Sequence, residues 1–227
     1  MPAVYSIDDV YKIINYALNI NQQGNLPPDK FNLIINQASY SYFRYLLGEY
    51  QKYQPGRPIA TPEPGQSSYI RESLSPFIEW PSTLTIDGQG RTPYPTDYEM
   101  WDAMYWGIYK QPVKFIQQGR LSSHINSSIN PVSRNPVFMS VYRGFQVYPV
   151  SIGATELSYI RTPQTMTWAY SNDIYGRPQF NAALSQNPQW QISDMWEVIV
   201  RALAIAGVNL QAQMVSQYAN MIKQGGQ

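Results

Sequence analysis

The spacing of the hydrophobic residues changes twice along this chain of 227 residues, and this change constrains the fold more than any other feature. Near both ends, apolar residues recur every three or four positions, which is typical of amphipathic helices. In the middle they alternate with polar residues, which is typical of strands. We therefore expect an α+β protein in which N- and C-terminal helices form a helical bundle with a central β-rich insertion domain.

The chain is expected to divide into four segments. Residues 1–54 carry two helical patterns separated by glycine and proline, which predicts a helical hairpin. Residues 55–66 contain four prolines and are predicted to form an extended linker. Residues 67–190 are predicted to be the β-rich insertion. Residues 191–227 are predicted to be a C-terminal helix that packs on the N-terminal hairpin, followed by a polar tail that either frays or docks on another protein.

Both terminal helical regions begin with a capping residue. Ser6 precedes a run with acidic residues in its first turn, so it is predicted to be the N-cap of the first helix. Ser193 is predicted to cap the last helix in the same way. Because that last helix is apolar on almost all sides, we expect the N-terminal hairpin to enclose it, with Trp196 buried.

The middle of the chain contains three clear strand signals. A strand at 83–86 ends at Asp87-Gly88, which is a turn signal. A hairpin is predicted to pair residues 137–142 with residues 145–148 across Arg143-Gly144, because the apolar residues alternate on both sides of a glycine. A third strand is predicted at 157–161.

The polar composition of the chain is unusual because it depends on amides rather than charges. Charged residues make up 14%, against about 25% in an average soluble domain. The chain has 14 Asn and 21 Gln, together with 19 Tyr and 6 Trp. Aromatic residues are enriched in protein interfaces and charged residues are depleted from interface cores. A compositional bias of the source would explain the amides but not the excess of tyrosine, so we expect extensive contacts between subunits.

Residue counts also exclude several kinds of chemistry. The chain has no cysteine, which excludes disulfides, thiolate nucleophiles and cysteine-bound metals. His124 is the single histidine and lies in a polar stretch that resembles a loop. No run of roughly 20 apolar residues could span a bilayer, so we expect a soluble protein with no membrane partner. The chain is predicted not to be an enzyme, to have no catalytic residues and to need no cofactor or metal.

Aromatic residues surround three carboxylates at positions 97, 99 and 102. The aromatic residues of interest are Tyr94, Tyr98, Trp101 and Trp106. Paired carboxylates beside aromatic rings are what a glycoside hydrolase would use, and aromatic rings also suit a sugar-binding platform. The preferred interpretation is that these four residues are interface aromatics, because nothing in the local sequence would separate the pKa values of the carboxylates.

Charge is distributed unevenly along the chain. Residues 1–109 carry 7 Lys/Arg and 11 Asp/Glu, whereas residues 110–177 carry 7 Lys/Arg and 2 Asp/Glu. Ordinary scatter along a single chain would explain this distribution equally well. In a ring, the basic flank of one copy would meet the acidic flank of the next, or Arg120, Arg134 and Arg143 would face the phosphates of DNA. Because no nucleic-acid-binding module is recognisable, any DNA contact is expected to be non-specific and sensitive to salt.

Four segments of the chain resemble a known group of proteins. They are Asn135-Pro136-Val137, Tyr142-Arg143-Gly144-Phe145-Gln146-Val147-Tyr148-Pro149, Leu157-Ser158-Tyr159-Ile160-Arg161-Thr162-Pro163 and Thr167-Trp168-Ala169-Tyr170. These segments are similar to segments of structural proteins of crAss-like, podovirus-type tailed bacteriophages. The flanking helices resemble those of head-to-tail connector adaptors, which are ring proteins beneath the portal.

The resemblance implies a virion structural protein that assembles in the host bacterial cytoplasm and lies at the junction of portal and tail. Its partners would be other copies of itself in a dodecameric ring, the portal protein and other tail ring proteins, and the ring would line the DNA exit channel. The portal-docking residues would belong to the C-terminal tail: Met214, Tyr218, Met221 and Ile222. The alternatives are another virion component, such as a distal tail ring or a capsid auxiliary protein, or a carbohydrate- or receptor-binding module.

Overall fold

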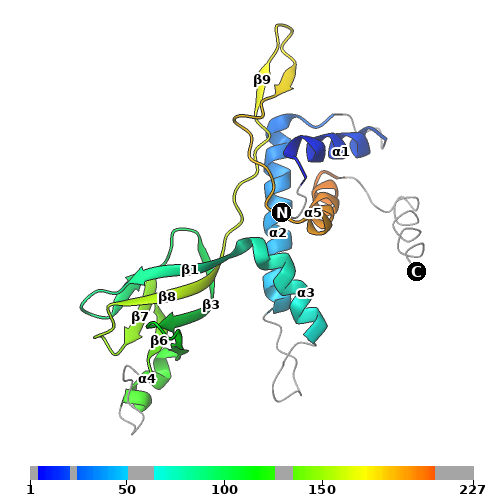
Figure 1. The fold of residues 1–227 in the computed structure, drawn as a ribbon. Helices are drawn as coiled ribbons and strands as arrows, with labels where there is room; N and C mark the ends of the chain where they lie inside the picture. Colours follow the sequence, from blue (N-terminus) through cyan, green and yellow to red (C-terminus); the bar gives the residue numbers. More distant parts are fainter. Residues whose placement is uncertain (1–4, 21–24, 51–63, 126–134, 208–227) are drawn as a thin grey trace. The chain divides into compact units, whose positions relative to one another are not determined.

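The chain folds into a mixed α+β structure with two compact units (Figure 1). The computed structural model describes residues 5–20, 25–50, 64–125 and 135–207. Residues 1–76 together with 163–227 form one unit, here called the helical unit, and residues 77–162 form the other, here called the β unit. The α+β class predicted from the sequence is therefore confirmed.

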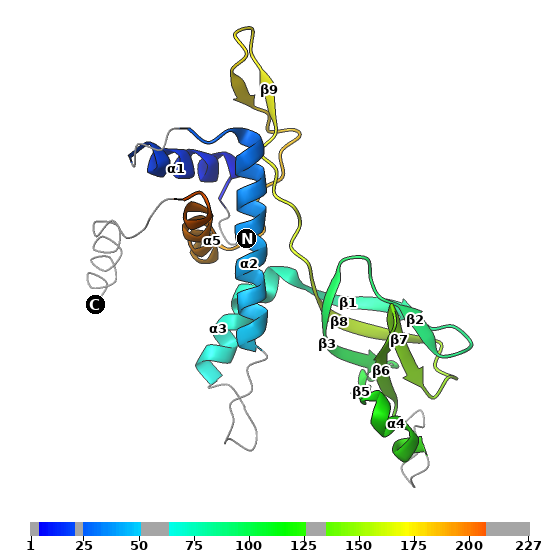
Figure 2. The ribbon, with the colours of Figure 1, turned by 180° about the vertical axis from the view of Figure 1, so that it is seen from behind.

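The helical unit is built on one long helix. Its elements are α1 (Ile7–Ile20), α2 (Pro28–Tyr50), α3 (Pro64–Leu74) and α5 (Ile192–Ile205), with a small hairpin of β9 (Tyr170–Asn172) and β10 (Pro178–Phe180). Helix α2 contacts α3 and α5, and α1 contacts α5. Figures 1 and 2 show α1 lying across α2 near the N-terminal end of α2, and the β9–β10 hairpin extending beyond that end.

Two of the helix starts follow from local sequence. The Ser6 hydroxyl accepts a hydrogen bond from the backbone N–H of Asp8 at 3.2 Å, so Ser6 caps α1 as predicted. Helix α2 begins at Pro28, where proline is tolerated because the first turn has no intrahelical N–H bond to lose. Helix α3 also begins at a proline, Pro64, and occupies positions that the sequence assigned to the end of the linker and the start of the β insertion. The rest of the predicted linker, residues 55–63, lies outside the described residues.

A buried carboxylate connects three helices of this unit. Asp194 in α5 is 1% exposed and accepts hydrogen bonds from the Tyr42 hydroxyl of α2 and the Ser73 hydroxyl of α3, each at 3.0 Å. The N-cap of α5 is Gln191, which makes no side-chain capping hydrogen bond to the helix, so the predicted cap at Ser193 is wrong. Because the Asp194 side of α5 faces inward, Trp196 lies on the outer side and is 46% exposed, against the prediction that it is buried.

Side-chain amides of α2 attach an extended segment to the helix. Asn32 donates to the carbonyl oxygen of Trp168 and accepts from its N–H, at 3.2 and 2.8 Å. Asn36, one turn later, makes the same pair of bonds with Met166, both at 2.8 Å. Residues 163–190 consequently belong to the helical unit. The β unit spans 77–162, whereas the sequence predicted an insertion over 67–190.

The β unit contains two four-stranded sheets. Its elements are η1 (Ser75–Phe77, at the boundary between the units), β1 (Ile78–Thr85), β2 (Arg91–Pro93), β3 (Tyr98–Trp106), β4 (Gln111–Pro112), β5 (Lys114–Phe115), α4 (Gln118–Ile125), β6 (Val137–Val141), β7 (Gly144–Tyr148) and β8 (Ala154–Arg161). One sheet has the order β1-β8-β3-β4 and the other β2-β7-β6-β5. Buried residues of both sheets, among them Met104, Phe138, Phe145 and Leu157, form one hydrophobic core.

The predicted strand at 157–161 and the predicted hairpin are confirmed, with a shift at the hairpin turn. Val141 pairs with Gly144, so the turn residues are Tyr142 and Arg143 rather than Arg143-Gly144, and Arg143 has a φ of 60°. Gly144 is the first residue of β7, where a Cβ atom would lie 2.2 Å from the carbonyl oxygen of Thr92 in β2. The glycine is needed for the approach of β2 and not for the turn.

Candidate functional site

The four predicted interface aromatics contribute to the edge of the β-unit core. Tyr94 and Tyr98 stack on one another with ring centroids 4.5 Å apart, and both meet Phe145 edge to face. Trp101 and Trp106 are also half-buried and pack against the same core. Much of each ring is therefore in contact with the chain itself, which leaves little ring surface for an open sugar-binding platform.

The neighbouring carboxylates also have partners within the β unit. The Tyr159 hydroxyl donates to Asp97 at 2.9 Å, and the Ser158 hydroxyl donates to Asp102 at 3.0 Å. Burial, with the hydrogen bond to the Asp97 carboxylate as the second cause, raises the pKa of Tyr159 to about 12. Tyr159 therefore remains a proton donor at neutral pH and holds Asp97 against strand β8.

The charge asymmetry of the sequence does not separate the two units. Residues 77–162 contain seven Lys/Arg and six Asp/Glu, because the acidic positions of β1 and β3 belong to the same unit as the basic positions that follow them. The asymmetry lies instead between the two sheets. The β2-β7-β6-β5 sheet, with α4 and its turns, carries four of the basic residues that are described: Arg91, Lys114, Arg120 and Arg143. The described carboxylates next to this sheet are Asp87, in the turn before β2, and Asp97, in the connection after β2, where Tyr159 of the other sheet binds it.

These four residues, here called the basic surface, include two that the sequence analysis did not select. Arg91 pairs in register with Gln146, and Lys114 with Val137, which places Arg91 and Lys114 on one face of the sheet at its opposite edges. Lys114, Arg120 and His124 line a cavity of about 770 Å³ beside α4. His124 lies near the end of helix α4, whereas the sequence analysis predicted a loop at this position.

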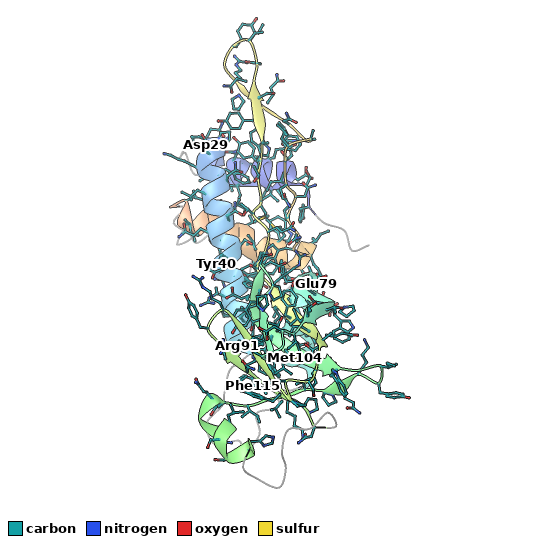
Figure 3. All side chains as sticks on the ribbon, turned by 90° about the vertical axis from the view of Figure 1, so that its left-hand side faces the viewer. Asp29, Tyr40, Glu79, Arg91, Met104 and Phe115 are labelled. Carbon is teal, nitrogen blue, oxygen red and sulfur yellow. The ribbon has the colours of Figure 1, made fainter. Side chains whose placement is uncertain are left out.

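All four residues of the basic surface are exposed, and Figure 3 labels Arg91. Within the described ranges, no ion pair joins any of the four to a carboxylate. The guanidinium of Arg143 instead lies over the ring of Tyr142, 5.0 Å from its centroid. Arg134, the third basic residue selected from the sequence, and the predicted docking tail at Met214, Tyr218, Met221 and Ile222 lie outside the described residues.

Helix α5 presents an apolar stripe to solvent. Ile192, Trp196 and Val200 recur every four residues on the exposed side of the helix, while Asp194, Val198 and Ala202 are buried on the opposite side. Isolated apolar residues on a surface need no explanation, but a continuous row along one helix is typical of an interaction surface. These three exposed residues are called the α5 stripe below.

Bulky apolar side chains also occupy the tips of three hairpins. Ile108 and Tyr109 lie in the β3–β4 turn, Tyr142 in the β6–β7 turn, and Ile174 and Tyr175 in the β9–β10 turn. All five are among the most exposed hydrophobic residues of the described chain. The sequence analysis did not select the two Ile-Tyr pairs, although each lies next to a glycine with positive φ that marks the turn.

Comparisons with known proteins add no assignment to this geometry. Neither a scan of protein-family models nor a search of curated proteins found a match to the chain. In the part of the chain that the structure describes, no three His, Asp or Glu residues are grouped so that they could hold a metal ion. The helices described there are too short or too polar to cross a membrane. The candidate site is therefore the set of exposed surfaces: the α5 stripe, the hairpin tips and the basic surface.

Proposed function

We propose that this chain is a structural subunit of a tailed-bacteriophage virion that assembles into a ring and connects the head to the tail. The observation that carries the proposal is the exposure of large apolar side chains on both units, along the α5 stripe and at the hairpin tips. A subunit in a closed ring is covered on two different surfaces by its two neighbours. Such a ring would remove these side chains from water and so stabilise the assembly.

In this proposal the helical unit forms the bundle predicted from the sequence and supplies the contact with the portal, with the β unit inserted into the bundle. The α5 stripe lies in the last described helix, directly before the segment whose residues Met214, Tyr218, Met221 and Ile222 were predicted to dock on the portal. One continuous C-terminal region would then contribute both the stripe and the docking tail. The subunit would reside in the virion, at the junction of portal and tail.

The basic surface supports a second part of the proposal, contact with the DNA that passes through the ring. Arg91, Lys114, Arg120 and Arg143 are exposed and face no described carboxylate in an ion pair. Phosphates of a passing duplex would interact with such residues without reading the base sequence. This contact would be weak at physiological salt, as it must be if the DNA is to slide past it.

Native mass spectrometry of the purified chain, alone and mixed with the portal protein, tests the ring. A dodecamer of 26.0-kDa subunits has a mass of about 312 kDa. A discrete species near this mass, formed alone or on the portal, supports the proposal. A chain that stays monomeric under both conditions contradicts it, and a stable trimer that binds glycans would favour a receptor-binding module instead.

Duplex binding over a range of salt concentrations tests the DNA contact. The variant with Arg91→Ala and Lys114→Ala is expected to bind more weakly, with a log–log salt slope smaller by about 0.9 for each lost phosphate contact. Lys30→Ala removes one exposed charge from the helical unit and serves as the control, with binding unchanged. Equal affinity and equal salt slope for all three proteins would exclude the basic surface as the DNA contact.

A further inference from the structure

Two turns of the chain share one backbone structure and one sequence pattern, Asp-x-x-Gly-Arg. The first is Asp87-Gly88-Gln89-Gly90-Arg91 between β1 and β2, and the second is Asp173-Ile174-Tyr175-Gly176-Arg177 between β9 and β10. In each turn the aspartate Oδ1 accepts from the N–H groups two and four residues later, at 2.9 and 2.7 Å in the first and at 2.8 Å twice in the second.

The remaining bonds of the two turns also correspond. The aspartate N–H donates to the arginine carbonyl oxygen at 2.9 Å in both turns, and the glycine N–H donates to the aspartate carbonyl oxygen at 2.9 and 3.0 Å. Gly90 and Gly176 have φ values of 83° and 75°. The aspartate, the glycine and the strand ends therefore specify the turn, and the two middle residues are free to vary.

The middle residues differ in a way that the turn does not require. The first turn has Gly88-Gln89, which is an ordinary polar tip. The second has Ile174 and Tyr175, which are 91% and 78% exposed. The same turn forms elsewhere in this chain with a polar tip, so the fold of the hairpin does not require the apolar pair. An exposed apolar pair on a fixed turn is suited to insertion into another protein.

The helical unit also has a cavity that matches this tip in composition. It has a volume of about 340 Å³, near the lower end of the range for ligand pockets, and lies where α1, the start of α2 and the base of the β9–β10 hairpin meet. Its lining includes Tyr11, Pro27, Pro28 and Tyr170, whose rings offer flat apolar surfaces to an isoleucine and a tyrosine side chain.

The charges beside the tip and the cavity are opposite. Asp29 lines the cavity, is exposed and accepts the Tyr170 hydroxyl at 3.4 Å. Figure 3 labels it at the start of α2, below the hairpin in that view. Arg177 is separated from the tip by Gly176 alone, and its guanidinium lies 5.9 Å from the centroid of the Tyr175 ring. An Arg177 guanidinium that arrives with the tip would meet a carboxylate at the cavity.

A chain does not fill its own cavity, because Ile174 and Tyr175 are exposed and the Asp173 hydrogen bonds hold them in the turn. We propose that the Ile174-Tyr175 tip of one copy inserts into the cavity at Tyr11, Pro28 and Asp29 of a second copy, with Arg177 facing Asp29. This inference rests on the proposed ring, since each copy would give its tip to one neighbour and receive a tip from the other. Such a heterologous contact repeats around a closed ring.

The chain provides its own matched substitution for the test. The double variant Ile174→Gly, Tyr175→Gln places the tip of the first turn on the second, so the hairpin is expected to form unchanged. Native mass spectrometry and sedimentation of this variant are expected to show self-association at least about tenfold weaker than in the wild type. Circular dichroism should remain the same as in the wild type.

A charge exchange tests the pairing itself. Arg177→Asp and Asp29→Arg are each expected to weaken self-association, and the variant with both changes is expected to recover it, because the pair is re-formed with reversed charges. If the tip variant assembles like the wild type, the inference is wrong and the proposed ring stands. If it loses only a complex with the portal protein, the tip binds a different partner and the inference is also wrong. If the wild type itself never assembles, the proposed function fails first.

Discussion

Removing one hydroxyl from the buried Asp194 network should destabilise the helical unit measurably. In Tyr42→Phe the ring still packs between α2 and α5, but Asp194 loses one of its two hydroxyl donors, both of which lie at 3.0 Å. Burial and the adjacent Asp194 carboxylate raise the pKa of Tyr42, so in the wild type the phenol is a neutral donor throughout the usual pH range. The substitution therefore removes a hydrogen bond without altering the net charge.

The size of the effect follows from the burial of the carboxylate. A hydrogen bond to a charged group contributes about 1.5–3 kcal/mol, and Asp194 is 1% exposed, so water cannot replace the lost donor. We expect the free energy of unfolding to fall by about 2 kcal/mol, which corresponds to a decrease in Tm of about 4–8 °C for a unit of this size. Adding Ser73→Ala removes both donors, and the combined loss should exceed the sum of the two single losses.

Urea denaturation followed by circular dichroism at 222 nm measures this loss. Tyr40→Phe is the matched control, because Tyr40 lies on the same helix, loses the same atom and is 48% exposed. Its free energy of unfolding should stay within about 0.5 kcal/mol of the wild type. If Tyr42→Phe is as stable as this control, Asp194 is not what holds α2, α3 and α5 together.

Three further predictions concern the two units. Asn36→Ala should lower the free energy of unfolding by about 1–3 kcal/mol, since two backbone groups lose their partner; a urea midpoint equal to that of the wild type would show that water replaces both bonds. Trp190→Ala should cost about 3–5 kcal/mol because this ring is 1% exposed, whereas Trp196→Ala should cost less than about 1 kcal/mol and weaken assembly instead; equal thermal shifts would contradict the assigned burial. Gly144→Ala should unfold the β unit at lower temperature than Gly153→Ala, because an added Cβ clashes with β2 at the first position and meets nothing within 4 Å at the second.

The local signals of the sequence predicted most of the secondary structure, but they did not predict which side of α5 is buried. Hydrophobicity alone places Trp196 inside and Asp194 outside, and the structure has the reverse. The reason is that Asp194 finds its donors on α2 and α3, more than 120 residues away along the chain. No local pattern contains that information.

The amides show the same limit. Their abundance was interpreted as a sign of contacts between subunits, yet Asn32 and Asn36 are used within the chain, where they bind the backbone of a segment more than 120 residues later. The sequence analysis placed that segment in the β insertion, whereas it belongs to the helical unit. The hairpin tip at Ile174 and Tyr175, in contrast, could have been found from the sequence, because the Asp-x-x-Gly-Arg pattern occurs twice and only one copy has an apolar tip.

An image of the assembled particle tests the account most directly. Electron cryomicroscopy of the virion, or of the chain reconstituted with portal protein, should show a closed ring of this subunit between portal and tail, with the apolar surfaces of α5 and the β9–β10 hairpin covered by protein. A particle in which the chain is a separate monomer, with these surfaces in contact with water, would contradict it.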